Sequence, residues 1–141
     1  FCHPQEFAGD AATNWRILEL AKWPVEIIAG SPEEVAARLP PLLAGAEWII
    51  DALLGTGARG DPQPLLAAAI DAINAAPGRR LAVDLPSGLD CDTGMPGRPT
   101  IRADHTCTFV APKVGMLKES AKPFVGEMQV VELGVPRALK E

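Results

Sequence analysis

Apolar positions near the start of the chain recur at the spacing of a helix. Ala11, Trp15 and Leu18 are three and four residues apart, so a helix from 11 to about 22 would have one apolar face. The carboxylate of Asp10 is suited to accept hydrogen bonds from the free amides of a first helical turn. We therefore predict an amphipathic helix here, capped by Asp10.

A short strand and a second helix are predicted next. "VEIIAG" at 25–30 is rich in β-branched residues, which is typical of a strand. Ser31 and Glu34 have the spacing of a capping box and flank a proline, which predicts the start of a helix. Because proline lacks an amide hydrogen, we expect Pro40 and Pro41 to end that helix.

The rest of the chain alternates between apolar runs and one further helical pattern. The runs "EWIIDALL", "RLAVDLP", "HTCTFVA" and "EMQVVELG" are typical of strands in a buried parallel sheet. Asp61 and Pro62 are expected to open a third helix, with an apolar face made by Leu66, Ala69, Ile70 and Ile73. This alternation predicts one domain over residues 1–141 with a Rossmann-like fold, a three-layer αβα sandwich around a mostly parallel sheet.

Composition narrows the class of protein. The net charge of −5 argues against binding to nucleic acid, and no apolar run approaches the ~20 residues of a membrane span. The three cysteines are widely spaced and lack a CxxC pair, so we predict neither a disulfide framework nor a zinc site, and we expect a cytoplasmic protein. "FCHP" at Phe1 reads as the end of a strand, so we expect the first strand of the sheet to lie before it.

Two consecutive predicted strands end in an acid, Asp51 in "WIID" and Asp84 in "LAVD". Parallel sheets bind ligands beyond the carboxyl ends of their strands, and neighbouring strands lie ~4.8 Å apart, so we expect both carboxylates in one pocket. Their repulsion would either raise the pKa of one of them, giving a general acid or base, or attract a cation between them. The plainer alternative is that each acid only caps the loop after its strand.

"GTGARG" at 55–60 matches the G-x-G-x-x-G pattern of dinucleotide-binding loops. Pro62 and Pro64 delay the following helix, so the third glycine falls outside it and a conventional dehydrogenase is disfavoured. Glycines still allow backbone amides to approach a phosphate, although the loop could also be a simple connection. Lys113 in "APKVG" is a weaker candidate for a phosphate or a negative intermediate, and Ser87 suits a ligand role better than a nucleophile.

Taken together, "DALLGTGARGD", "AVDLPSGLDCDTG", "RADHTCTFVAPKVG" and "GEMQVVELGVP" resemble the NAD(P)H-hydrate epimerase family, also described as YjeF N-terminal domains. The resemblance covers nearly the whole chain. It implies a Rossmann-like domain, often a homodimer, that interconverts the R and S forms of hydrated NADH and NADPH (NADHX and NADPHX). A companion ADP- or ATP-dependent dehydratase, which accepts only the S form, then restores the nucleotide.

The resemblance also assigns roles to residues. It implies that Asp51 and Ser87 are ligands of a potassium ion (K+) and that Asp84 is the catalytic residue, in contact with the reactive end of the substrate. The loop along the substrate phosphates would comprise Gly55, Thr56, Gly57, Ala58, Arg59, Gly60 and Asp61.

One family feature has no counterpart in the sequence. The family carries an earlier N-N-G-G-D-G loop that supplies a further potassium ligand and more of the phosphate site. If the chain acts without such a loop, we expect weak cation binding and little or no activity. The alternative to an epimerase is therefore a nucleotide-binding or scaffold module of the same fold without catalysis.

Overall fold

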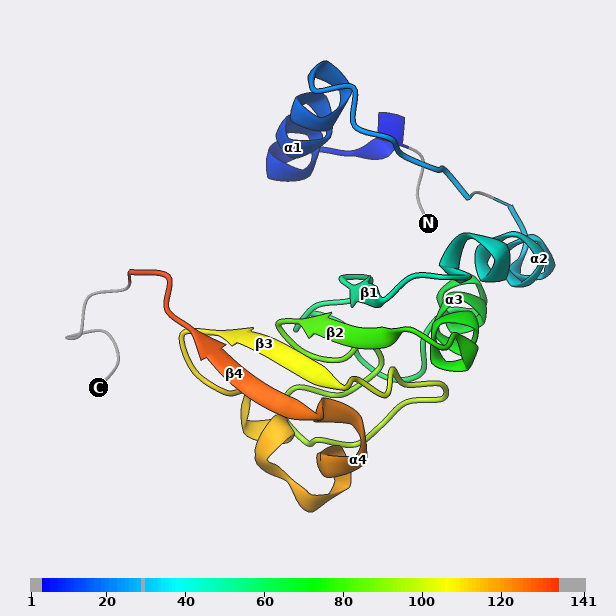
Figure 1. Cartoon of the computed structure of the whole chain (residues 1–141). Coiled ribbons are helices and arrows are strands. Elements are labelled where there is room, and N and C mark those ends of the chain that lie inside the picture. The colour runs from blue at the N-terminus through cyan, green and yellow to red at the C-terminus, as the bar shows by residue number, and fades with distance from the viewer. Residues whose placement is uncertain (1–3, 29, 135–141) are drawn as a thin grey trace.

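Four parallel strands form the centre of the molecule. The structure is a computed structural model that describes residues 4–28 and 30–134. The strands lie in the order β1-β2-β3-β4 and every neighbouring pair is parallel (Figure 1). They are β1 (Trp48–Asp51), β2 (Arg79–Val83), β3 (His105–Phe109) and β4 (Glu127–Val131).

Helical segments connect and flank these strands. The α-helices are α1 (Gly9–Leu20), α2 (Pro32–Leu43), α3 (Pro64–Ala75) and α4 (Lys122–Val125). Three short 3-10 helices complete the described elements, η1 (Pro4–Glu6), η2 (Val114–Leu117) and η3 (Glu119–Ala121). The parallel sheet with flanking helices confirms the Rossmann-like α/β class. Within the described ranges no helix has the length and apolar character needed to span a bilayer.

The capping box predicted for α2 is present, but the predicted end of this helix is wrong. The Ser31 hydroxyl accepts a hydrogen bond from the Glu34 amide at 3.3 Å, and the Ser31 amide donates to the Glu34 carboxylate at 2.8 Å. The helix continues through Pro40 and Pro41 to Leu43. Both prolines lie in its last turn. Each removes one helical hydrogen bond to a carbonyl four residues earlier, but the fixed φ of proline suits a helix, and the helix ends at Leu43, soon after them.

The other two predicted helices, α1 and α3, begin at residues different from those expected. The N-cap of α1 is Ala8. Asp10 lies inside the first turn, where its negative charge interacts favourably with the positive end of the helix dipole. The third helix begins at Pro64 and not at Asp61, with Gln63 as its N-cap. Its apolar face is largely as predicted, because Ala69, Ile70 and Ile73 are buried.

The strand predicted over 25–30 is not found in the described part of this segment, 25–28 and 30. Val25 and Ile27 keep 45% and 42% of their surface exposed. A strand requires a neighbouring strand to bind its amides and carbonyls, and the β-branched composition of this segment supplies no such partner.

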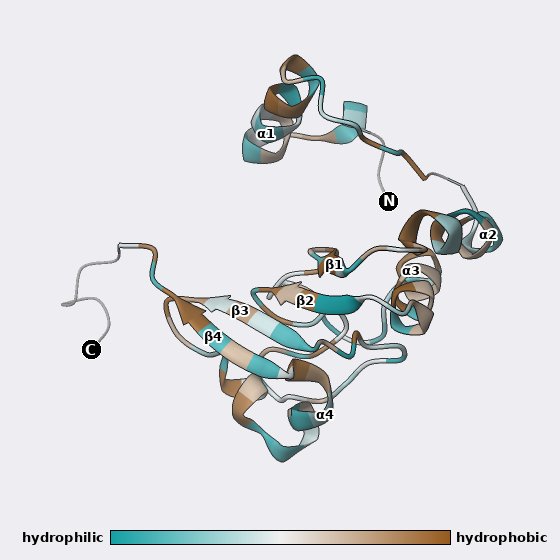
Figure 2. Cartoon of the chain, in the orientation of Figure 1, coloured by the Kyte–Doolittle hydropathy of each residue, from teal (hydrophilic) through white to brown (hydrophobic). Residues whose placement is uncertain are grey.

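Both apolar cores lie on the same face of the sheet. Asp51, Ala82, Thr106 and Met128 are paired across the four strands and therefore share one face. On this face Ala82 packs with α3 in one cluster, while Met128 packs against a second cluster that includes residues of η2, η3 and α4. Helix α2 packs on α3, and Figure 2 shows apolar residues where these two helices meet.

The opposite face of the sheet is only partly covered. Trp48 and Ile50 on this face of β1 are 43% and 55% exposed. Helix α1 lies on this side of the sheet (Figure 1), and its Trp15 packs edge-on against Phe7, with ring centroids 6.0 Å apart. No residue of α1 is buried, so the apolar side predicted for this helix is not packed against the sheet.

Candidate functional site

A buried carboxylate lies at the end of β1. Asp51 is fully buried, and it accepts hydrogen bonds from the Ser87 amide at 2.8 Å and from the Ser87 hydroxyl at 2.6 Å. Burial raises the pKa of Asp51 because it disfavours the charged form, and the hydrogen bonds from Ser87 and Leu53 oppose that shift in part. The structure therefore brings together the two residues that the resemblance assigns to a cation.

The loop after β1 is tied to the same pair. The Leu53 amide donates to the Asp51 carboxylate at 3.3 Å, and the Leu54 amide donates to the Ser87 hydroxyl at 2.9 Å. These bonds satisfy backbone groups that leave the sheet at this point. They also fix where the glycine-rich loop begins relative to the loop after β2.

Asp84 follows β2 directly and has an uncommon backbone conformation. Its φ of 73° lies in the left-handed region, which residues other than glycine seldom adopt. The Asp84 carboxylate forms an ion pair with the ammonium group of Lys113, and both side chains are largely but not fully buried. Lys113 also donates to the Thr108 hydroxyl at 3.0 Å and to the Phe109 carbonyl at 3.3 Å.

The two carboxylates share the rim of the sheet but have separate partners. Among the described residues no hydrogen bond joins Asp51 to Asp84, and no lysine or arginine forms an ion pair with Asp51. Asp84 instead has its own cation in Lys113. From the sequence, Lys113 was a weak candidate, because the position of a long side chain in a loop is not fixed by its neighbours in the chain.

The glycine-rich loop presents open backbone to solvent. Its first turn is closed by a hydrogen bond from the Ala58 amide to the Gly55 carbonyl, at 3.1 Å. A Cβ atom at Gly55 or Gly57 would have nothing within 4 Å, so these glycines leave space beside the chain. The third glycine, Gly60, lies outside α3, which begins at Pro64, and the loop therefore differs from a dinucleotide fingerprint.

Arg59 holds this loop against the loop that follows β2. Its guanidinium donates to the Asp92 carboxylate at 2.7 Å and to the Thr56 and Ala58 carbonyls at 2.9 and 3.0 Å. It also contacts the Cys91 sulfur at 3.4 Å. Arg59 therefore acts as a connection between two loops in this structure.

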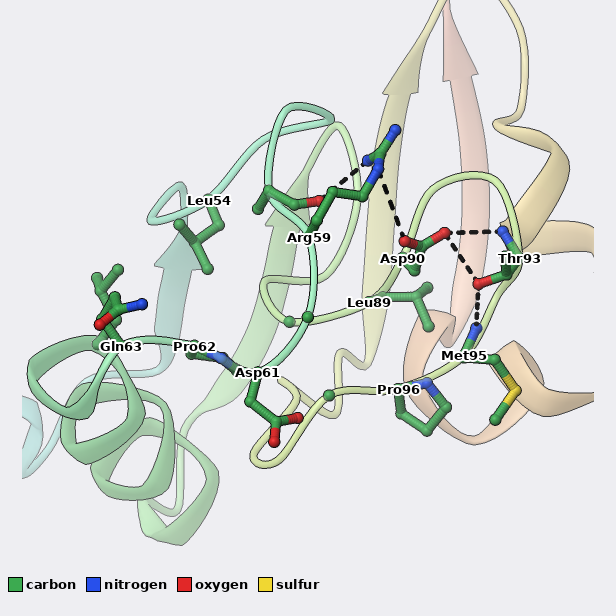
Figure 3. A pocket seen from close by; sticks show the side chains of 15 residues that line it. Leu54, Arg59, Asp61, Pro62, Gln63, Leu89, Asp90, Thr93, Met95 and Pro96 are labelled. Atoms are coloured by element: carbon green, nitrogen blue, oxygen red, sulfur yellow. Dashed lines mark hydrogen bonds and ion pairs between the residues drawn. The ribbon is translucent and has the colours of Figure 1, made fainter.

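A cavity of about 360 Å³ lies beside these two loops (Figure 3). It is bounded by the segment from Leu54 to Leu66 on one side and by the segment from Gly88 to Gly97 on the other. Asp61 lines it and accepts a hydrogen bond from the Arg98 amide at 2.8 Å. Neither Asp51 nor Asp84 is among the lining residues.

Comparison with known protein families gives a match for most of this chain. The model of the family described as YjeF-related protein N-terminus matches residues 1–115. The chain belongs to this family. The matched range contains Asp51, Asp84, Ser87 and Lys113, so all residues of the candidate site lie within the YjeF-related domain.

Several curated proteins are similar to this chain over most of its length. The chain is 46% identical over 138 residues to an NAD(P)H-hydrate epimerase of Pirellula staleyi, covering 98% of this chain and 60% of that protein. It is 42% identical over 134 residues to an NAD(P)H-hydrate epimerase of Rhodopirellula baltica, covering 95% and 52%. A bifunctional NAD(P)H-hydrate repair enzyme Nnr of Moorella thermoacetica is 38% identical over 136 residues, covering 96% and 25%. The YjeF-related chain thus spans at most 60% of the length of these relatives.

Proposed function

We propose that this chain belongs to an NAD(P)H-hydrate epimerase, which interconverts the R and S forms of hydrated NADH and NADPH. The names of its relatives support this activity. The observation that carries the proposal is the Asp84–Lys113 pair at the end of β2, where a strained backbone holds a carboxylate at the ligand-binding rim.

Asp84 is the proposed catalytic residue. Epimerisation at C6 of the hydrated nicotinamide ring requires the hydroxyl to leave as water and water to return on the other face. The ring is cationic between these two steps, and a carboxylate at Asp84 would stabilise that charge or exchange a proton with the hydroxyl. Lys113 would orient Asp84 through their ion pair.

The glycine-rich loop is the proposed site for the substrate phosphates. Gly55 and Gly57 leave the backbone accessible, which suits the approach of a phosphate to amide groups. Arg59 supplies positive charge to the same loop, although Asp92 offsets much of it.

A potassium ion is the proposed cofactor, and the chemistry of Asp51 and Ser87 fits it. Potassium binds oxygen ligands, and here a buried carboxylate without a cationic side-chain partner in the described ranges lies 2.6 Å from a hydroxyl. When bound, the ion would supply positive charge that organises the loops after β1 and β2. Thermal unfolding in KCl and in NaCl tests this: the Asp51→Asn variant should lose any stabilisation that is specific to potassium.

The proposal extends to partners and location. The Moorella thermoacetica relative is named a bifunctional NAD(P)H-hydrate repair enzyme, which supports functional coupling to an ADP- or ATP-dependent dehydratase. We further propose a homodimer in the cytoplasm. In the described part of the chain Cys91 and Cys107 are free thiols, which suits a reducing compartment.

Replacement of Asp84 by Asn tests the function. In the full-length protein, Asp84→Asn should slow conversion of R to S hydrate by at least ~100-fold, as expected for loss of acid–base catalysis. Chromatography of the epimers measures the rate above the spontaneous reaction. Asp71→Asn, on the exposed side of α3, serves as the control and should keep wild-type turnover. Unchanged turnover in Asp84→Asn would remove Asp84 from the mechanism, whereas substrate binding without interconversion in the wild type would favour the scaffold module.

A further inference from the structure

The cavity beside the glycine-rich loop has two apolar walls. Leu54 and Leu66 belong to one wall, and Leu89 and Met95 belong to the other. Figure 3 shows Leu54 and Leu89 on the two sides of the space, which lies between the loops. Its volume of about 360 Å³ is within the range of small-molecule sites. The walls are suited to a flat apolar group such as a purine base.

The polar groups of the cavity are mainly acidic. Asp61 and Asp90 line it, and in the described part of the chain Arg59 is the one basic residue that lines it. Arg59 is already bound by Asp92 at 2.7 Å and lies 3.9 Å from Asp90. The carboxylates therefore outnumber the cation, and the cavity would disfavour an additional phosphate group.

One Asp61 oxygen is available to a ligand. Its Oδ1 atom accepts the Arg98 amide at 2.8 Å, and in the described ranges no hydrogen bond involves its Oδ2 atom. Carboxylates at the ribose of bound dinucleotides accept a hydrogen bond from the 2′-hydroxyl and exclude a 2′-phosphate. Asp61 offers the same chemistry at the edge of this cavity.

The position of the cavity connects it to the proposed substrate path, so the inference rests on the proposed function. With the nicotinamide end at Asp84 and the diphosphate along Gly55 to Gly57, the loop continues directly into Ala58, Gly60 and Asp61, which line the cavity. We propose that this cavity binds the adenosine half of the substrate, and that Asp61 makes the enzyme prefer hydrated NADH to hydrated NADPH.

Binding of substrate fragments tests the cavity apart from catalysis. Titration calorimetry of the full-length protein should show that adenosine 5′-monophosphate binds. The monophosphate should also be a competitive inhibitor of the epimerisation of hydrated NADH. Met95→Ala, which removes an exposed part of one wall, should weaken this binding by about 3- to 10-fold. Leu117→Ala is a matched control, because Leu117 is as exposed as Met95 (63% and 61%) but does not line the cavity. Equal affinities of the two variants would overturn the inference.

A second probe tests the role of Asp61. Adenosine 2′,5′-bisphosphate should bind at least ~10-fold more weakly than the monophosphate, because its 2′-phosphate meets the carboxylates. Asp61→Asn retains an acceptor for the Arg98 amide and should narrow this difference to about 3-fold or less. Equal binding of the two probes to the wild type would overturn the preference.

The experiments distinguish failure of the adenosine site from failure of the proposed epimerase function. Epimerisation without monophosphate binding would overturn only the adenosine site. Monophosphate binding that Met95→Ala weakens, in a protein without epimerisation, would support the site and overturn the proposed function.

Discussion

The ammonium group of Lys113 lies against the carboxylate of Asp84, although 29 residues separate them in the chain. Lys113 reaches this position from the loop after β3, and the Thr108 hydroxyl and Phe109 carbonyl accept its remaining hydrogen bonds. All three donors of the ammonium group thus have a partner. The side chain is therefore held in one place, which gives the Asp84 carboxylate a fixed orientation at the rim of the sheet.

Removal of this ammonium group should impair epimerisation without unfolding the protein. Lys113→Met keeps the length of the side chain but loses its charge, and we expect kcat/KM to fall at least ~10-fold because Asp84 loses its orienting partner. Lys113→Arg keeps a cation and should recover part of the loss, chiefly in kcat. Lys118→Met, an exposed neighbour in the chain, is the control and should resemble the wild type. If Lys113→Met and Lys118→Met have the same kcat and KM, Lys113 has no positioning role.

A pH-dependent contribution to stability is expected from Asp104. A hydrogen bond from the Arg80 amide, at 2.8 Å, is the main cause that lowers the pKa of Asp104 below its ordinary value of 3.8, with a further contribution from the Arg80 charge. The unfolded chain then binds the proton more tightly than the folded protein, so this contribution is present above pH 3.8 and is lost as the pH falls through the lowered pKa.

Urea unfolding at a series of pH values measures that contribution. The difference in free energy of unfolding between wild type and Asp104→Asn should be constant above about pH 5 and should shrink below pH 3.8. Asn retains an acceptor for the Arg80 amide, so the comparison isolates the charge. A difference that does not change with pH across this window would show that the lowered pKa makes no contribution.

The sequence predicted the parallel sheet because the apolar runs typical of strands are repeated along the chain, and each run can be recognised from adjacent residues alone. Each apolar run has the length and composition of a buried strand, and β1 to β4 form where those runs occur. The run at 25–30 has the same composition but lacks a neighbouring strand in the described structure. Composition indicates that a segment can form a strand, whereas pairing depends on residues far away in the chain.

The candidate site was only partly accessible to sequence reasoning. The resemblance paired Asp51 with Ser87, and the structure brings the two side chains together at 2.6 Å. The expectation that Asp51 and Asp84 would lie in one pocket followed from strand spacing alone. The left-handed backbone at Asp84 and its pairing with Lys113 depend on a turn and a distant loop, which no local pattern encodes.

Alanine substitutions at Gly57 and Gly94 should have different effects, the first on KM and the second on the free energy of unfolding. A Cβ atom at Gly57 would have nothing within 4 Å, so Gly57→Ala should change the free energy of unfolding by less than about 0.5 kcal/mol. Its methyl group should nevertheless obstruct a phosphate and raise KM several-fold.

Gly94 has φ of 70°, and a Cβ there would clash with the Gly115 carbonyl. Gly94→Ala should therefore destabilise the protein by about 1–3 kcal/mol. Chemical denaturation and steady-state kinetics of both variants give the comparison, and an unchanged KM in Gly57→Ala would contradict the phosphate site.

The two faces of β1 should differ sharply in their response to truncation. Ile49 is 5% exposed in the core beneath the sheet, whereas its neighbour Ile50 is 55% exposed on the other face. Ile49→Ala should cost about 2–5 kcal/mol of unfolding free energy, because it leaves a cavity beside Ile70 and Ala82. Ile50→Ala removes the same atoms from a surface that is largely in water and should cost under about 1 kcal/mol. Urea denaturation of this 141-residue chain measures both values, and the substitutions are chemically matched. Equal losses would mean that another part of the protein covers Ile50 in solution, as a third layer would.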